Sequence, residues 1–284
     1  MMLGGGCSRE SSNDSLPPSQ SKSNPLQQDK LEPVSEFVSD GKLFTSVPAD
    51  ESGIRFLHQW NPTDEFAMQL NSYACTAGVA IGDYDGDGRP DIFLANQTDG
   101  GSLYRNLGNF QFEDVTQSSG ASARGMWTAG VSFVDIDNDR DLDLFLCGFN
   151  CANRLYLNNG DGTFLERGKS FGLAYQGAST MMSFADYDRD GDLDLLVVLD
   201  DIRRQVLPPL LIRNISPRET EGGERLHWLE VKLVAVISNG SSIGAEVRVR
   251  IGDRWQTRQV LGGHSSHAQS ERVVHFGLGT AAIA

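Results

Sequence analysis

Short apolar runs and acidic stretches alternate three times in the middle of the chain. Residues 78–95, 130–147 and 181–198 each read as an apolar run, a stretch rich in aspartate and small turn residues, and a second apolar run. Two apolar, β-prone runs joined by such a turn predict a β-hairpin. Runs with helical periodicity are absent between the three stretches, so the pattern predicts strands.

Further strand-like motifs follow these hairpins. A Leu-x-x-Asn motif occurs at 103–106, 155–158 and 211–214, and a Phe-initiated motif follows at 110–116 and, more loosely, at 164–167. Residues 44–47 look like the same closing strand of a preceding unit. Four short strands every 50 residues or so, as here, match the period of a propeller blade. The chain is therefore predicted to be all-β, with four-stranded, propeller-type blades.

Aspartates fall at the same loop positions in all three turns, namely one, three, five and nine. They are Asp83, Asp85, Asp87 and Asp91 in the first loop, Asp135, Asp137, Asp139 and Asp143 in the second, and Asp186, Asp188, Asp190 and Asp194 in the third. The main-chain carbonyl of position seven can add an oxygen, from Arg89, Asp141 or Asp192. Hard oxygen ligands at flexible distances suit Ca²⁺ better than Mg²⁺. Neither His nor Cys lies inside the loops, which disfavours zinc and copper.

Two other interpretations of the loops were possible from their first residues. An EF-hand needs a bidentate Glu at position twelve and a helix on each side, whereas position twelve is Leu94, Leu146 or Val197, inside apolar runs. Aspartate turns without metal remain an alternative. They are disfavoured because four neighbouring carboxylates repel one another and tend to hold protons or a cation.

Position six differs between the loops. It is Gly88 in the first and Gly191 in the third, but Arg140 in the second. A sharp turn at this point favours glycine because the backbone needs a positive φ. An arginine there would cost about 1 kcal/mol or more, so the second site is predicted to bind calcium more weakly.

The repeated loops resemble the FG-GAP/VCBS repeat, the calcium-loop blade of integrin α-subunit propellers and of many bacterial surface proteins. Beyond them, residues 228–233, 243–249, 256–258 and 275–279 resemble the ASPIC/UnbV domain, which follows such repeats in the cartilage acidic protein family. The resemblance implies a propeller of about seven blades followed by a small β domain. Residues 245–251 and 256–261 also alternate like two strands joined at Gly252 and Asp253.

Three domains follow from these assignments. Residues 1–42 are predicted to be a disordered tether, 43–217 the calcium-loop repeats, and 218–284 the ASPIC/UnbV-like β domain. The repeats have room for about half of the blades that the resemblance implies, so an incomplete or shortened propeller is expected. An open blade edge invites strand pairing with another chain.

The chain's charge and its N-terminus bear on partners and location. A formal net charge of -14 disfavours nucleic acid, which needs a basic face. The sequence before Cys7 resembles the end of a bacterial lipoprotein signal, with a chance match as the alternative. Membrane contact is therefore expected only through a lipid anchor at Cys7, and the protein is expected to be extracytoplasmic, either secreted or at the cell surface.

The remaining reactive residues do not form a catalytic set. Cys147 and Cys151 are close enough in sequence for a disulfide, or they are two free thiols. His264 and His267 lie in a Gly/Ser-rich loop and are interpreted as loop residues. The sequence predicts a calcium-binding, non-catalytic binding or adhesion protein with an extracellular protein or carbohydrate ligand. The alternative is a hydrolase-associated FG-GAP protein with an unrecognised catalytic site.

Overall fold

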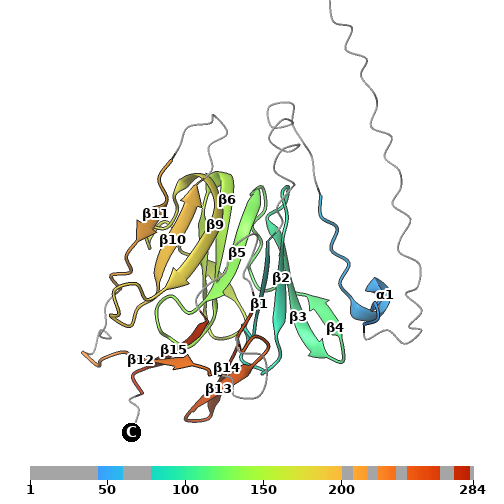
Figure 1. Cartoon of the computed structure of the whole chain (residues 1–284). Helices are drawn as coiled ribbons and strands as arrows, with labels where there is room; N and C mark the ends of the chain where they lie inside the picture. The colour runs from blue at the N-terminus through green and yellow to red at the C-terminus, as the bar shows by residue number, and fades with distance from the viewer. Residues whose placement is uncertain are drawn as a thin grey trace, which may run out of the picture. The chain divides into compact units, whose positions relative to one another are not determined.

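The computed structural model describes residues 44–59, 78–199, 207–216, 223–234, 242–262 and 272–281 (Figure 1). The chain divides into two compact units, Met1–Ser46 and Val47–Ala284. The predicted tether, Cys7, His264 and His267 lie outside the described residues. No helix within the described ranges combines the length and the apolar character needed to cross a bilayer.

The first blade is an antiparallel sheet of four strands in sequential order. Its strands are β1 (Val79–Gly82), β2 (Asp91–Ala95), β3 (Gly101–Gly108) and β4 (Gln111–Asp114). The aspartate loop connects β1 to β2, the Leu-x-x-Asn motif lies in β3, and the Phe-initiated motif contributes β4. The predicted hairpin and its two additional strands are confirmed.

Two further blades repeat this order. The second contains β5 (Thr128–Val134), β6 (Asp143–Ala152), β7 (Arg154–Asn158) and β8 (Phe164–Glu166), and the third contains β9 (Gln176–Ala185), β10 (Asp194–Leu199) and β11 (Leu210–Ile212). The far end of β6 pairs with the start of β9, which joins the two blades into a seven-stranded sheet. Among the described residues, no fourth strand pairs with β11.

The middle blade is covered on both faces, which explains why its strands read as continuous apolar runs. Leu144 and Leu146 of β6 belong to a core shared with the first blade. Phe145 and Cys147, the alternate residues of the same strand, belong to a core shared with the third blade. Because successive side chains of a strand point to opposite faces, all four are fully buried.

The C-terminal region contains two strand pairs. β12 (His227–Lys232) pairs with β15 (Val273–Gly279), and β13 (Glu246–Ile251) pairs with β14 (Arg254–Gln259). The turn at Gly252 and Asp253 is present as predicted. Val260, Val274, Phe276 and Leu278 form the buried centre of this region. All-β architecture is therefore confirmed here as well.

The segment before the first blade differs from the sequence-based expectation. Residues 44–47 form no strand, and a single helical turn, α1 (Ala49–Ser52), follows them. Pro48 precedes the turn with a fixed φ of -62°, and Gly53 ends it in the left-handed region at φ 76°. A closing strand requires a neighbouring third strand to pair with, and the structure provides none for residues 44–47 among the described residues.

Candidate metal centres in the hairpin loops

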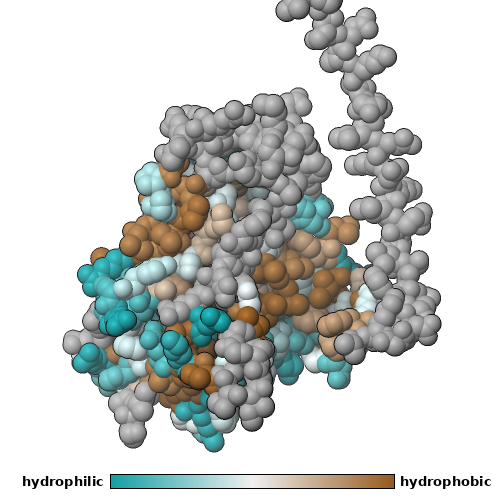
Figure 2. All heavy atoms as spheres, in the orientation of Figure 1, coloured by the Kyte–Doolittle hydropathy of each residue, from teal (hydrophilic) through white to brown (hydrophobic). Residues whose placement is uncertain are grey.

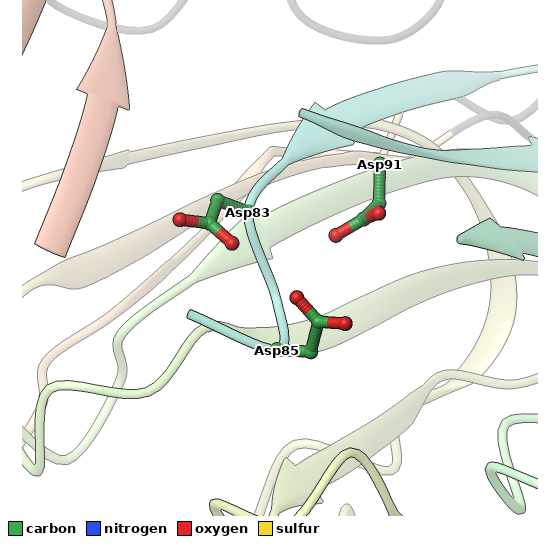
Figure 3. A group of neighbouring side chains, drawn as sticks. All are labelled: Asp83, Asp85 and Asp91. Carbon is green, nitrogen blue, oxygen red and sulfur yellow. The ribbon is translucent and has the colours of Figure 1, made fainter. Parts of the chain in front are cut away.

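Three carboxylates converge in each hairpin loop. The triads are Asp83, Asp85 and Asp91 in the first loop, Asp135, Asp137 and Asp143 in the second, and Asp186, Asp188 and Asp194 in the third. In each triad, one oxygen from every carboxylate lies within 4.8 Å of the others. Figure 3 shows the first triad, with its carboxylates turned toward one another. Loop positions one, three and nine thus face a common centre.

The aspartate at position nine fixes the shape of each loop through both of its oxygens. In the second loop, the backbone N–H of Ile136 donates to Oδ2 of Asp143 over 3.0 Å, and the N–H of Asn158 in the third strand donates to Oδ1 over 2.9 Å. Asp91 and Asp194 accept the equivalent pairs of bonds in the other loops. This carboxylate is buried in all three copies. It therefore ties the start of the loop to the blade.

The aspartate at position one closes the other side of the loop. The N–H of Gly88 donates to Oδ2 of Asp83 over 3.0 Å, and the N–H of Gly191 donates to Oδ2 of Asp186 over 2.9 Å. Both glycines have a positive φ, 86° and 95°, and Arg140 adopts 91° at the same position. The expected positive φ is confirmed, and Arg140 is held in a conformation that favours glycine.

Positions five and seven make other contacts. Asp87, Asp139 and Asp190 each accept the backbone N–H of position seven through Oδ1. The side chains of position seven point to different partners, since Arg89 pairs with Asp87 and Asp141 pairs with Arg254 over 2.5 Å. The position-five carboxylates lie outside the triads. That the main-chain carbonyls of position seven contribute an oxygen to the ion stays a prediction.

Burial makes the charged form of the loop carboxylates unfavourable. It raises the pKa of Asp83 to about 6 and that of Asp91 to about 8, and repulsion from neighbouring loop aspartates adds to both shifts. Burial likewise raises the pKa of Asp135 to about 7. Among the described residues, Oδ1 of Asp83 and Oδ1 of Asp135 are buried without a hydrogen-bond partner. Unpaired buried carboxylate oxygens fit a cation, which would supply the missing charge and contacts.

The asparagine of the Leu-x-x-Asn motif connects consecutive loops in the second and third blades. The side-chain amide of Asn158 donates to the carbonyls of Tyr84 in the first loop, over 2.8 Å, and Leu142 in the second, over 3.1 Å. Asn214 makes the equivalent bonds to Ile136 and Leu193. Sequence analysis found this asparagine as a repeat marker but missed its role. Its recurrence after every loop, as the last residue of the same four-residue motif, was the available signal.

The C-terminal strands contact the second loop, which sequence analysis also missed. The N–H of Gly277 donates to Oδ2 of Asp135 over 3.1 Å, and Nη2 of the buried Arg258 lies 4.0 Å from the same oxygen. A side chain at position 277 would collide with this loop, because its Cβ would lie 2.6 Å from Cα of Asn138. The C-terminal region therefore holds Asp135, at position one of the second loop. By contrast, Asp83 and Asp186 are held by glycine N–H groups of their own loops.

The two cysteines in the described part of the chain are free thiols. Cys147 is buried, and Sγ of Cys151 lies 3.8 Å from the carbonyl oxygen of Trp127. Of the two alternatives that the sequence left open, the structure contains the unpaired thiols.

Comparisons with protein-family models identify both parts of the chain. A model described as FG-GAP-like repeat matches residues 83–146 and 135–197, and a model described as ASPIC and UnbV matches residues 235–284. The FG-GAP matches begin at position one of the first and second loops. They therefore take in all three triads.

Curated relatives agree with these matches. The mouse (Mus musculus) protein cartilage acidic protein 1 is 27% identical over 85% of this chain, and the human (Homo sapiens) protein of the same name is 27% identical over 71%. The chain spans only 39% and 31% of their respective lengths. A solved structure of an Agrocybe aegerita lectin that recognises non-reducing terminal N-acetylglucosamine covers 66% of the chain and 53% of its own, at 18% identity and a TM-score of 0.30. That score is too low to indicate a common overall arrangement. The chain thus carries FG-GAP-like repeats followed by an ASPIC and UnbV domain, and it is homologous to cartilage acidic protein 1.

Proposed function

We propose that this chain is a calcium-stabilised, non-catalytic binding protein that works outside the cytoplasm. The observation that carries the proposal is the threefold convergence of carboxylates at loop positions one, three and nine. A chance acidic surface would not repeat one arrangement of three carboxylates in three blades, each time around a buried position nine with the same hydrogen bonds.

The chemistry of the loops favours calcium over other ions. All the converging side chains are carboxylates, and calcium accepts six to eight such oxygens at variable distances. Asp83, Asp85 and Asp91 would hold the ion in the first loop, with the equivalent residues in the other two. Bound calcium would neutralise the buried negative charge and so stabilise the hairpin.

The proposed location and partner rest on similarity. Cartilage acidic protein 1 is named as an acidic protein of cartilage, and the FG-GAP repeat is typical of cell-surface and secreted proteins. Extracellular calcium-binding modules have a Kd of about 10⁻⁴ to 10⁻³ M. The calcium concentration outside cells, about 1 mM, would keep such sites largely occupied. We expect the ligand to be an extracellular protein or carbohydrate, recognised by the blades once calcium has ordered their loops.

Thermal unfolding with calcium and with EGTA tests the proposal. At about 2 mM calcium, each site with a Kd in that range stabilises the fold by about 0.7–1.8 kcal/mol. Three sites together should raise the Tm by about 4 °C or more. Magnesium at the same concentration should raise it less. Equal melting temperatures in calcium and EGTA would count against the whole proposal.

A position-three variant separates metal binding from loop structure. Asp85→Asn removes one carboxylate of the first triad. The side chain of Asp85 also accepts a local hydrogen bond from the N–H of Asp87, which the asparagine oxygen can still accept. We expect this variant to reduce the calcium-dependent part of the Tm and to leave the Tm in EGTA nearly unchanged. Asp161→Asn, in an exposed turn outside the loops, is the matched control and should change neither value by more than about 1 °C.

A further inference from the structure

The strand β15 of the C-terminal region contacts the second hairpin loop through its backbone. The N–H of Gly277 donates to Oδ2 of Asp135 over 3.1 Å, and the N–H of Gly279 donates to the carbonyl of Asn138 over 3.2 Å. Both acceptors belong to the loop between β5 and β6. The strand can therefore make these two bonds only while the loop keeps the shape in which Asp135 and Asn138 face β15.

The third loop meets the same strands. Nε2 of His275 lies 3.1 Å from the carbonyl oxygen of Gly191, and a Cβ on Gly191 would overlap the indole of Trp228 in β12. The side-chain amide of Asn138 donates to the carbonyl of Gly191 over 3.3 Å and to Oδ1 of Asp192 over 2.8 Å, which joins the second and third loops. Hydrophilic residues gather at the loop end of β9 and β10 in Figure 2. We refer to the contacts of β12 and β15 with these two loops as the loop seam.

The loop seam buries a carboxylate of the second triad. Asp135 is 3% exposed, and Asp137 and Asp143 each bring a carboxylate oxygen within 4.8 Å of one of its oxygens. Nη2 of Arg258 lies 4.0 Å from Oδ2 of Asp135, but one positive charge does not balance three converging carboxylates. Burial of an unbalanced charge is strongly unfavourable. A cation in the second loop would remove this penalty and so favour the contact with β15.

We propose that the loop end of the second and third blades is a calcium-dependent docking surface for the C-terminal strands of the same chain. With calcium bound, both loops hold the shape that β12 and β15 contact, and the charge beneath β15 is balanced. Without calcium, the triad carboxylates repel one another and the loop seam opens. The inference rests on the proposed function, because it assigns a role to the calcium that the loops are proposed to hold. Since such coupling is reciprocal, docking also strengthens calcium binding in these two loops.

The first loop provides a comparison within the same chain. Its triad repeats the geometry of the other two, and its position-one residue, Asp83, accepts the N–H of Gly88 from its own loop. The hydrogen bonds of the loop seam go to the second and third loops. Calcium in the first loop should therefore stabilise its own blade and affect the loop seam less.

Hydrogen exchange of single amides in the full chain, followed by NMR, tests the proposal. The N–H groups of Gly277 and Gly279 report on the loop seam, and those of Leu144 and Leu146 in the buried strand β6 report on global stability. Replacing calcium with EGTA should speed exchange at Gly277 and Gly279 by about tenfold or more, and by more than it does in β6. Equal rates in calcium and EGTA, or an increase no larger than that in β6, would overturn the proposal.

The same experiment separates this inference from the proposed function. A Tm that rises with calcium, combined with exchange at Gly277 and Gly279 that ignores calcium, would defeat the docking surface alone. A Tm and exchange rates that both ignore calcium would defeat the proposed function as well.

A matched pair of variants identifies the loop that controls the seam. Asp137→Asn and Asp85→Asn make the same change at position three of the second and first triads, and both side chains accept a local N–H from position five. Both variants should reduce the calcium-dependent rise in Tm. At about 2 mM calcium, the ratio of the exchange rates of Gly277 and Gly279 in EGTA to those in calcium should fall by about fivefold in Asp137→Asn alone. Equal ratios in the two variants would overturn the proposal.

Discussion

Replacing Arg140 with glycine tests how backbone strain limits the second loop. Arg140 has a φ of 91°, between the 86° of Gly88 and the 95° of Gly191 at the same loop position. A non-glycine residue there costs about 1–2 kcal/mol. Glycine loses about 0.5–1 kcal/mol more backbone entropy on folding. The Nε of Arg140 donates a hydrogen bond to the carbonyl of Asp139 over 3.1 Å, but this bond is exposed and contributes little.

The balance predicts that Arg140→Gly stabilises the folded chain by about 0.5–1 kcal/mol. Urea unfolding in EGTA measures this directly as a higher midpoint at constant slope. Part of the strain can be relaxed in the metal-free loop and return only when calcium binds. Removing that part in Arg140→Gly should make calcium binding at the second site about two- to fivefold tighter than in the parent chain. Isothermal titration of the variant and the parent chain gives that ratio.

The first loop supplies the matched reverse substitution. A Cβ on Gly88 would have no described atom within 4 Å, so Gly88→Arg imposes the unfavourable φ without a collision. It should lose about as much stability as Arg140→Gly gains. Gly191 is unsuitable, because a Cβ there would overlap the indole of Trp228. The role assigned to φ at this position would be refuted if Arg140→Gly does not raise the free energy of unfolding and Gly88→Arg does not lower it.

Three further predictions follow from buried polar groups. Asp143→Ala leaves two backbone N–H donors without their acceptor, so urea unfolding in EGTA should show a free energy of unfolding lower by about 2–4 kcal/mol. A decrease below about 1 kcal/mol would contradict the conclusion that Asp143 ties the loop to the blade. Asn158→Ala should cost about 1–3 kcal/mol in the same assay, because its amide is buried between two loop carbonyls, whereas the exposed Asn159→Ala should be nearly neutral. Burial raises the pKa of the Cys147 thiol, so a thiol reagent should label Cys151 first, and labelling of Cys147 should track global unfolding.

Much of the fold could be predicted from the sequence because the repeat fixes its local chemistry. Two apolar runs flanking an aspartate turn form a hairpin in every copy, and the hydrogen bonds to position nine are made within one blade. The strand predicted at 44–47 is the exception. A strand is stable only when paired, so its sequence alone could not show that a partner was lacking.

The part of the site that was missed depends on residues far apart in sequence. Gly277 meets Asp135 across 142 positions, and nothing in the local pattern around either residue specifies that approach. The Gln-Thr-Arg motif containing Arg258 was recognised only as a family resemblance. Which carboxylates form a triad was also beyond the sequence, because the aspartates at positions three and five both accept a local backbone N–H and only position three joins the triad.

The amide of Asn158 spans two successive loops, so loss of order in one blade removes a hydrogen bond from its neighbour. Arrays of repeats behave as one-dimensional chains in which each unit is supported by the units beside it. Fraying should therefore start at the outermost repeats and move inward, and amide hydrogens of the central repeat should be the slowest to exchange with solvent.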